Sequence, residues 1–386
     1  MPGYELIGDE ELKESIDVFK KGGILFRQGF DNLRNNSYKV DEFEKAFSNK
    51  LKTNYALAVT SGTAALRVAL ASLNINKGDE VITQSFTFVA TVEAIIESKA
   101  IPICANIDKT LNLDPCKLEK LINNKTKAVI VVHMLGTPAN LIEIKKICDR
   151  HKIALIEDTA WGCGGSLNGK YLGTWGDIGT FSFDFAKTIT TGEGGMVVSN
   201  NKNIYEKAKA WHDHGHQNNP NLPRWEDSRK NSGFNFRMME LQGAVGLAQL
   251  KKLDLIVKSQ RKNKDYLWNA INDIKGIECR SMPSGSYDTA DALVFFVPSN
   301  DIAKKCRENL IENGLSTKIL PEAITWHFAG TWTHMSELIE SHKNNLKHDL
   351  LESYELLSRA VAIPITVKDQ TDLASLLRKS IINAIN

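Results

Sequence analysis

The sequence predicts an α/β protein built on a mostly parallel sheet, with a smaller α+β unit toward its C-terminus. Between about residues 55 and 199, short β-branched runs alternate with helical patterns. The runs are apolar on both sides, which is typical of parallel strands that helices cover on both faces. A chain of 386 residues is also too long for one simple core, so we expect a large domain with a smaller companion.

The individual elements follow from composition and periodicity. The expected strands are YALAVT (55–60), EVIT (80–83), IPICAN (101–106), AVIVVH (128–133), IALIED (153–158) and GTFSF (179–183). The clearest helical patterns between them are AALRVALASL (64–73), FVATVEAIIES (88–98) and ANLIEIKKICDRH (139–151). In such a sheet the ligand binds beyond the carboxyl ends of the strands, so we expect the site there.

Two long helical patterns follow the strands, over residues 237–253 and 255–273. A shorter mixed α and β segment completes the chain. We therefore expect a large ligand-binding domain over residues 1–254, which includes the N-terminal segment, and a small C-terminal domain over residues 255–386.

Composition excludes several classes of protein. The chain has 48 Lys and Arg against 46 Asp and Glu, a net charge of +2, which leaves no excess of positive charge to bind nucleic acid. The longest apolar runs are far shorter than the ~20 residues that cross a bilayer, and the acidic start MPGYELIGDEELKES lacks the features of a signal peptide. We expect a cytoplasmic protein that does not associate with membranes. The six scattered cysteines form no C-x-x-C pair and favour reduced thiols over disulfides or zinc.

The stretch FSFDFAKTITTGEGG (181–195) places a single lysine, Lys187, just after a predicted strand. A P-loop is excluded because its pattern requires glycine where this chain has Phe181 and Ala186. A lone lysine is most often a solvated surface residue. A partly desolvated amine at a strand end is instead suited to act as a Schiff-base nucleophile, and the neighbouring motifs decide between these interpretations.

Three further features give Lys187 a chemical setting. Asp158 ends the strand IALIED, where a carboxylate can keep a pyridine nitrogen protonated. TSGTAAL (60–66) joins a strand to a helix, and its Gly62, hydroxyls and free helix amides suit a phosphate. Phe88 can stack on a planar ring. Alone, these features indicate an ion pair, a helix cap and a core aromatic; together with the lysine they are what pyridoxal 5′-phosphate requires.

With these motifs in place, the chain resembles the sugar aminotransferases of the DegT/DnrJ/EryC1/StrS family, which have the aspartate-aminotransferase fold. The matching segments occur in the family's order between residues 55 and 254, and the block around the lysine is the most specific. They are TSGTAAL, GDEVITQSFTFVAT, VVHMLGTPAN, IEDTA, GDIGTFSFDFAKTITTGEGGMVVSN and GFNFRMMELQGAVGLAQLKKLD. The resemblance implies pyridoxal 5′-phosphate as the cofactor and an aspartate-aminotransferase-like architecture.

The resemblance also implies roles for single residues. Lys187 would be the Schiff-base lysine and the general base, with Asp158 on the pyridine nitrogen and Phe88 stacked on the ring. Asn235, in GFNFR, would be lent to the phosphate site of a neighbouring subunit, which implies a homodimer with shared active sites. The residues that would hold the phosphate within one chain are Gly62, Thr63 and Ser182.

One position departs from the family's pattern. Members usually carry glutamine three residues after the aspartate, near the phenolic oxygen of the cofactor, whereas this chain has Trp161. An indole N–H donates one hydrogen bond but is larger and accepts none. We therefore expect Trp161 to lie in the cofactor site in place of the glutamine and to reshape the pocket there.

Four short segments resemble the branch of the family that aminates C8 of 3-deoxy-manno-octulosonate, in lipopolysaccharide and cell-surface glycan synthesis. They are MPGYELIGDEE (1–11), DHGHQNN (213–219), QRKNK (260–264) and WHFAGTWTHM (326–335). This implies that Trp326 and His327 contact the acceptor, although a packed tryptophan with a hydrogen-bonded histidine is the competing interpretation. The segment HDHGH lacks the further ligands of a metal site, and the family that the chain resembles requires no metal, so we expect none. The resemblance implies that this segment is a loop at the subunit contact, where His214 can touch the substrate.

The resulting hypothesis is a pyridoxal-phosphate-dependent aminotransferase that moves an amine from an amino acid, expected to be glutamate, to a keto or aldehyde sugar. A nucleotide-linked keto-sugar is the alternative acceptor. Pyridoxamine-dependent sugar dehydratases use the same scaffold with histidine in place of the lysine, so Lys187 argues against that class. The alternative from a different class is a cofactor-binding regulatory protein that has lost turnover because Trp161 blocks the pocket.

Overall fold

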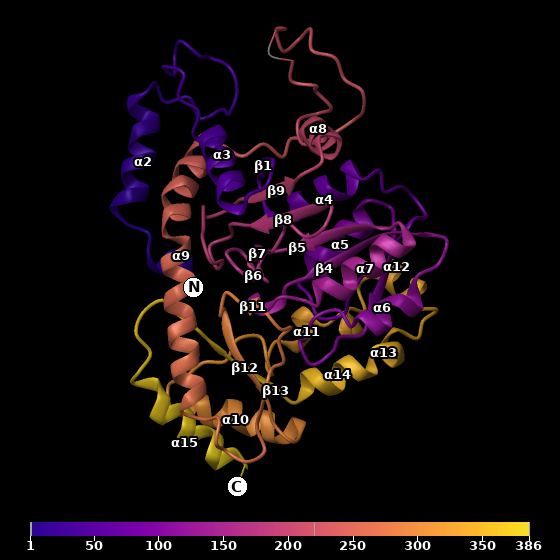
Figure 1. Ribbon diagram of the computed structural model, residues 1–386, viewed down its shortest axis with the longest axis vertical. Coiled ribbons are helices and arrows are strands. Elements are labelled where there is room, and N and C mark those ends of the chain that lie inside the picture. Colours follow the sequence, from indigo (N-terminus) through magenta and orange to yellow (C-terminus); the bar gives the residue numbers. More distant parts are fainter. Residues whose placement is uncertain (1, 220, 386) are drawn as a thin grey trace.

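A sheet of seven strands lies at the centre of the chain in the computed structural model, which describes residues 2–219 and 221–385 (Figure 1). Its order is β1-β9-β8-β5-β4-β2-β3. The bounds are β1 Tyr55–Val59, β2 Glu80–Gln84, β3 Ile101–Ala105, β4 Thr126–Val132, β5 Ala154–Asp158, β8 Ile178–Ser182 and β9 Gly195–Ser199. Strands β3, β2, β4, β5 and β8 pair in parallel, and β9 pairs antiparallel with both β8 and β1. The prediction of an α/β fold with a mostly parallel sheet is confirmed.

Strand β9 is the element of this sheet that was not predicted. It returns directly beside β8, with Ser182 opposite Gly195 in the register. The connection between the two strands, residues 183–194, therefore lies at the carboxyl end of β8. This is the segment that carries Lys187.

Alternate residues of each strand pack into cores on opposite faces of the sheet. Leu57 and Val59 of β1 belong to the core formed with α4 (Gly62–Ser72), α5 (Val89–Glu97) and α8 (Lys202–Trp211). Ala56 and Ala58 belong to the core formed with α3 (Lys39–Leu51) and α9 (Glu240–Asn269). Helices α6 (Pro115–Leu121) and α7 (Leu141–His151) cover the rest of this second face. Helices on both faces leave the carboxyl ends of the strands as the place for a ligand.

Helix α9 is one helix of 30 residues, whereas the sequence analysis expected two. No glycine or proline interrupts the chain between residues 247 and 275, so nothing breaks the helix at Asp254. Its first half packs against α3, where Gly243 and Gly246 allow close approach to Val40 and Phe43. The division at residues 254 and 255 falls inside α9, and we retain it as a proposal.

The C-terminal unit combines a small sheet with helices (Figure 1). Its strands are β10 (Glu278–Cys279), β12 (Ala292–Phe296) and β13 (Ala360–Pro364), covered by α10 (Asn300–Glu312) and α15 (Leu373–Ile385). The short helices α11 (Ile324–His327), η2 (Ala329–Thr331), α12 (Ser336–Ser341), α13 (Leu346–Asp349) and α14 (Leu351–Ser358) complete it. One continuous core joins this unit to the main sheet, since Phe328 and Trp332 pack with Phe86, Val132 and Trp161.

The remaining elements are shorter or peripheral. At the N-terminus lie α1 (Pro2–Glu5) and α2 (Asp9–Lys20), and η1 (Met134–Gly136) follows β4. Strands β6 (Ser166–Leu167), β7 (Lys170–Tyr171) and β11 (Ser286–Tyr287) form a third small sheet. Across the described part of the chain, every helix is too short or too polar to cross a membrane.

Candidate active site

A cavity of about 390 Å³ opens where strands β1, β2, β4, β5 and β8 end. It brings together the residues that the sequence analysis assigned to the cofactor within one chain. These are Gly62, Thr63, Phe88, Asp158, Trp161, Ser182 and Lys187. Trp326 and His327, assigned to the acceptor, also line it from the C-terminal unit. The volume is in the range of small-molecule sites in proteins.

Backbone hydrogen bonds fix the segment that carries Lys187. The Lys187 N–H donates to the carbonyl of Asp184 at 3.0 Å, and the Lys187 carbonyl accepts the N–H of Gly3 at 3.2 Å. The Thr191 N–H donates to the carbonyl of Phe183 at 2.9 Å and closes the segment back toward β8. The side chain of Lys187 therefore enters the cavity from a backbone that these hydrogen bonds fix in place.

The Lys187 amine is buried inside the cavity. Its Nζ lies 3.7 Å from the centre of the Trp161 ring. Burial lowers the pKa of Lys187, and the positive charge of Lys318 lowers it further, against the opposing carboxylates of Asp291, Asp184 and Asp158. A lowered pKa leaves a larger fraction of the amine uncharged and nucleophilic near neutral pH.

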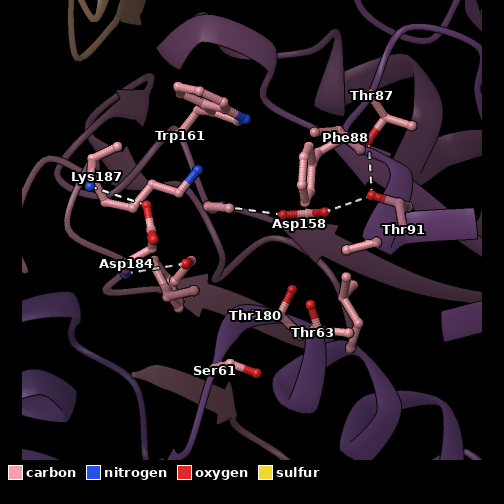
Figure 2. A pocket seen from close by; sticks show the side chains of 18 of the residues that line it. Ser61, Thr63, Thr87, Phe88, Thr91, Asp158, Trp161, Thr180, Asp184 and Lys187 are labelled. Atoms are coloured by element: carbon pink, nitrogen blue, oxygen red, sulfur yellow. Dashed lines mark hydrogen bonds between the residues drawn. The ribbon is translucent and has the colours of Figure 1, made fainter. Parts of the chain in front are cut away.

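Asp158 presents a buried carboxylate at the end of β5. Its Oδ2 accepts the hydroxyl of Thr91 at 3.0 Å, and its Oδ1 accepts the Ala160 N–H at 3.2 Å (Figure 2). Burial raises the pKa of Asp158, while these hydrogen bonds and the charge of Lys187 oppose the rise. A protonated pyridine nitrogen is a partner that favours the charged form of such a carboxylate.

The start of α4 forms a cradle for an anion. Ser61 caps the helix, because its Oγ accepts the Ala64 N–H at 3.0 Å. The N–H groups of Gly62 and Thr63 belong to the first turn, so no carbonyl of the helix pairs with them. A Cβ on Gly62 would lie 2.7 Å from the Cβ of Ser182, so glycine keeps this space open. The cradle fits the phosphate of pyridoxal 5′-phosphate, as Asp158 fits its ring nitrogen.

Aromatic side chains surround the rest of the cavity. Phe88 is 44% exposed, and its ring centre lies 5.7 Å from that of His327. His327 is 5% exposed, and its Nδ1 has no hydrogen-bond partner among residues 2–219 and 221–385. Burial lowers the pKa of His327 to about 4, so the imidazole is neutral at physiological pH and can hydrogen-bond a ligand. Trp326 is 71% exposed and offers a flat apolar surface at the edge of the site.

Trp161 forms the wall between Lys187 and the C-terminal unit. It is 9% exposed, and its backbone carbonyl accepts the hydroxyl of Thr289 at 3.0 Å. The indole is thus packed in place, and Figure 2 shows it beside the amine of Lys187. A tryptophan here narrows the cavity without removing it.

His214 and Asn235 lie outside the cavity of their own chain, on exposed positions of the segment between α8 and α9. The His214 N–H donates to the carbonyl of Phe234 at 3.1 Å. Neighbouring Asp213 forms ion pairs with arginine side chains of the same segment. In the part of the chain that the structure describes, no group of three or more His, Cys, Asp or Glu could hold a metal. The roles expected for His214 and Asn235 involve a second subunit and stay predictions.

The sequence analysis did not predict several residues that support the charged groups of the site. Thr91 supports Asp158, and Asp291 and Lys318 lie near Lys187 and Trp161. Thr91 follows Phe88 by three residues in the helical pattern 88–98, so helical spacing could have indicated it. Asp291 and Lys318 come from the C-terminal unit, where no spacing relates them to the lysine block.

Comparison with known proteins agrees with this site. Residues 9–379 match the DegT/DnrJ/EryC1/StrS aminotransferase family. The GDP-perosamine synthase of Vibrio cholerae is 41% identical over 223 residues, which cover 58% of this chain and 59% of that protein. The chain therefore matches about three fifths of the length of this curated relative.

Solved structures share the whole fold. The crystal structure of 3-amino-5-hydroxybenzoic acid (AHBA) synthase has a TM-score of 0.85 at 25% identity and covers 100% of this chain and 98% of that one. The E. coli GDP-4-keto-6-deoxy-D-mannose-3-dehydratase with bound hydrated PLP has a TM-score of 0.82 at 25% identity, with 97% of each chain covered. The predicted aspartate-aminotransferase-like fold is confirmed, and pyridoxal 5′-phosphate is the cofactor of this site. The chain belongs to the DegT/DnrJ/EryC1/StrS aminotransferase family.

Proposed function

We propose that the protein is a pyridoxal-phosphate-dependent aminotransferase that moves the amine of an amino acid, with glutamate as the donor, to a keto or aldehyde carbon of a sugar. One observation carries the proposal. A buried lysine amine, a buried carboxylate and an anion cradle at a helix start line the same cavity. The exchange is balanced, because the donor becomes a 2-oxo acid while the sugar carbonyl becomes an amine.

The cofactor, when bound, withdraws electrons from the carbon that carries the amine. The chain supplies the other parts of the reaction. Lys187 would hold the cofactor, and its amine, once free and uncharged, would take the proton from the donor Cα and deliver it to the C4′ carbon on the other side of the amine nitrogen. Asp158, oriented by Thr91 and the Ala160 N–H, stabilises positive charge at the ring nitrogen. The indole of Trp161 excludes water from one side of the amine.

For the acceptor, we propose a sugar that lies against the aromatic wall of the cavity. The rings of Trp161 and Trp326 offer apolar faces, and the neutral imidazole of His327 lines the same cavity. The four segments that resemble the octulosonate branch support C8 of a 3-deoxy-manno-octulosonate derivative, in lipopolysaccharide or cell-surface glycan synthesis. The similarity to GDP-perosamine synthase supports a nucleotide-linked keto-sugar instead. The proposal also includes a homodimer in which Asn235 reaches the phosphate of the partner's site.

An amine-transfer screen tests this function. The purified protein is incubated with pyridoxal 5′-phosphate, glutamate and single keto-sugars, both free and nucleotide-linked, and amino-sugar products are identified by mass spectrometry. We expect one class of acceptor to yield an amino sugar together with an equal amount of 2-oxoglutarate. No product and no 2-oxoglutarate with any acceptor would instead support the regulatory protein that has lost turnover.

A further inference from the structure

A second lysine lies next to the ring that contacts Lys187. The Nζ of Lys318 is 5.0 Å from the centre of the Trp161 ring and 2.7 Å from Oδ1 of Asp291. The Lys318 side chain is 20% exposed and that of Asp291 is 2% exposed, so this ion pair is largely withdrawn from solvent. One indole therefore contacts two ammonium groups, one from the β8–β9 connection and one from the C-terminal unit.

The C-terminal unit holds Trp161 at two points. The hydroxyl of Thr289 donates to the Trp161 carbonyl at 3.0 Å, which fixes the backbone. Lys318, bound by Asp291, contacts the ring. Thr289 and Asp291 flank Ala290, which has a left-handed φ of 54°, so one short, sharply turned segment supports both contacts. The same segment is anchored to η1, because the Thr289 N–H donates to the Gly136 carbonyl at 3.1 Å.

We propose that Lys318 is a positioning residue for amine transfer. Held by Asp291, it fixes the indole of Trp161 against which the amine of Lys187 lies, and its positive charge acts on that same amine. The inference rests on the proposed role of Lys187. It means that the C-terminal unit helps to set the position and the charge state of the Lys187 amine. It does so through Trp161, the position at which the family usually has glutamine.

The charges around Lys187 predict the direction in which its pKa should shift in each variant. Carboxylates of Asp291, Asp184 and Asp158 stabilise the protonated amine, whereas Lys318 destabilises it, and a protonated His327 would act like Lys318. Removal of Lys318 should therefore raise the pKa of Lys187. Removal of the Asp291 charge should lower it. A general loosening of the fold would instead shift the pKa of Lys187 in the same direction in both variants, toward the pKa of an ordinary exposed lysine.

Competitive acetylation of the full-length chain, freed of cofactor, measures the Lys187 amine directly. The labelling rate of the Lys187 peptide is followed by mass spectrometry across pH in the wild type, Lys318→Met, Lys318→Arg and Asp291→Asn. At pH values below the pKa of Lys187, we expect the Lys187 peptide to be labelled more slowly in Lys318→Met than in the wild type, by about threefold or more. In Asp291→Asn it should be labelled faster than in the wild type. Lys318→Arg keeps the charge and should label at nearly the wild-type rate. Lys305→Met removes an exposed lysine of α10 and should change nothing.

Two results would overturn the proposal: wild-type labelling in Lys318→Met, or shifts of the same sign in Lys318→Met and Asp291→Asn. If Lys318→Met does not fold, Lys318→Gln replaces it, because the amide still hydrogen-bonds Asp291. The labelling requires neither sugar nor amino donor. A failure of the proposed sugar amination therefore leaves this measurement valid, and the two failures are distinguishable.

Discussion

The amine of Lys187 lies 3.7 Å from the centre of the Trp161 indole ring, within the cavity that the Asp158 carboxylate also lines. This relationship joins the β8–β9 connection to the segment that follows β5. It explains how a lysine just beyond a strand becomes buried rather than solvated. The indole shields the amine from water, and the strand-end carboxylate provides the charge that a pyridinium ring requires.

Lys187→Ala should abolish amine transfer. Without the amine the chain loses both its attachment to the cofactor and the group that moves the proton, so kcat should fall by about 10³-fold or more. Steady-state release of 2-oxoglutarate measures the effect, with Lys170→Ala, a surface lysine of β7, as the control. Retention of more than a tenth of the activity would exclude Lys187 as the proton carrier.

Asp158→Asn should lower kcat by about 10²-fold or more while the fold is retained, because the amide is isosteric but carries no charge for the ring nitrogen. Thr91→Val removes one hydrogen bond to this carboxylate and leaves its charge, so its effect should be clearly smaller. Parallel measurement of kcat and the melting temperature separates loss of charge from loss of structure. Equal activity of Asp158→Asn and the wild type would contradict the assignment.

Gly62→Ala should weaken binding of the phosphate group. The added Cβ would lie 2.7 Å from the Cβ of Ser182, so the cradle must shift or close. Crowding of this kind costs about 1–3 kcal/mol, and we expect the Kd of pyridoxal 5′-phosphate to rise about tenfold or more. Ser61→Ala, which removes the N-cap but leaves the cradle open, should cost about 1 kcal/mol of stability. Fluorescence titration with the cofactor distinguishes the two; unchanged affinity in Gly62→Ala would rule out the cradle.

His212 should make the protein less stable in acid. Burial, together with the charge of Arg27, lowers the pKa of His212 from 6.5 to about 3. Below pH 6.5 the unfolded chain binds a proton that the folded chain refuses, so stability falls between pH 6.5 and about 3. One such proton contributes at most about 1.4 kcal/mol per pH unit. Urea unfolding across this range should show a shallower pH dependence in His212→Gln.

The control for this experiment is His348→Gln, because the His348 side chain is 78% exposed. This side chain lies at the surface and is not buried like His212, so this variant should keep the wild-type pH dependence of stability. If His212→Gln and the wild type lose stability with the same slope, another group is responsible for the acid sensitivity.

Much of the site could be predicted from the sequence because its residues lie at the ends of strands within continuous motifs. Gly62, Asp158 and Lys187 each follow a β-branched run, and parallel strands bring their carboxyl ends to one edge of the sheet. The mostly parallel sheet was predicted for the same reason. Strand β9 was missed because GMVVS directly follows a glycine-rich loop and is antiparallel, outside the βα alternation.

The contributions of the C-terminal unit were harder to predict. Lys318 reaches Trp161 only because the small sheet packs against the main sheet, a long-range contact that local patterns do not encode. The two expected helices are one, since no residue near Asp254 can interrupt α9. His214 and Asn235 were assigned by resemblance alone, and a single chain places them outside its own cavity.

Borohydride reduction of the protein loaded with pyridoxal 5′-phosphate, followed by peptide mass spectrometry, identifies the amine that holds the cofactor. We expect the reduced cofactor on the peptide that contains Lys187, and its loss from that peptide when glutamate is added before reduction. Lys318 is the internal comparison, because its amine lies 5.0 Å from the same indole ring. Modification of Lys318 instead of Lys187, or of no lysine at all, would contradict the assignment of Lys187.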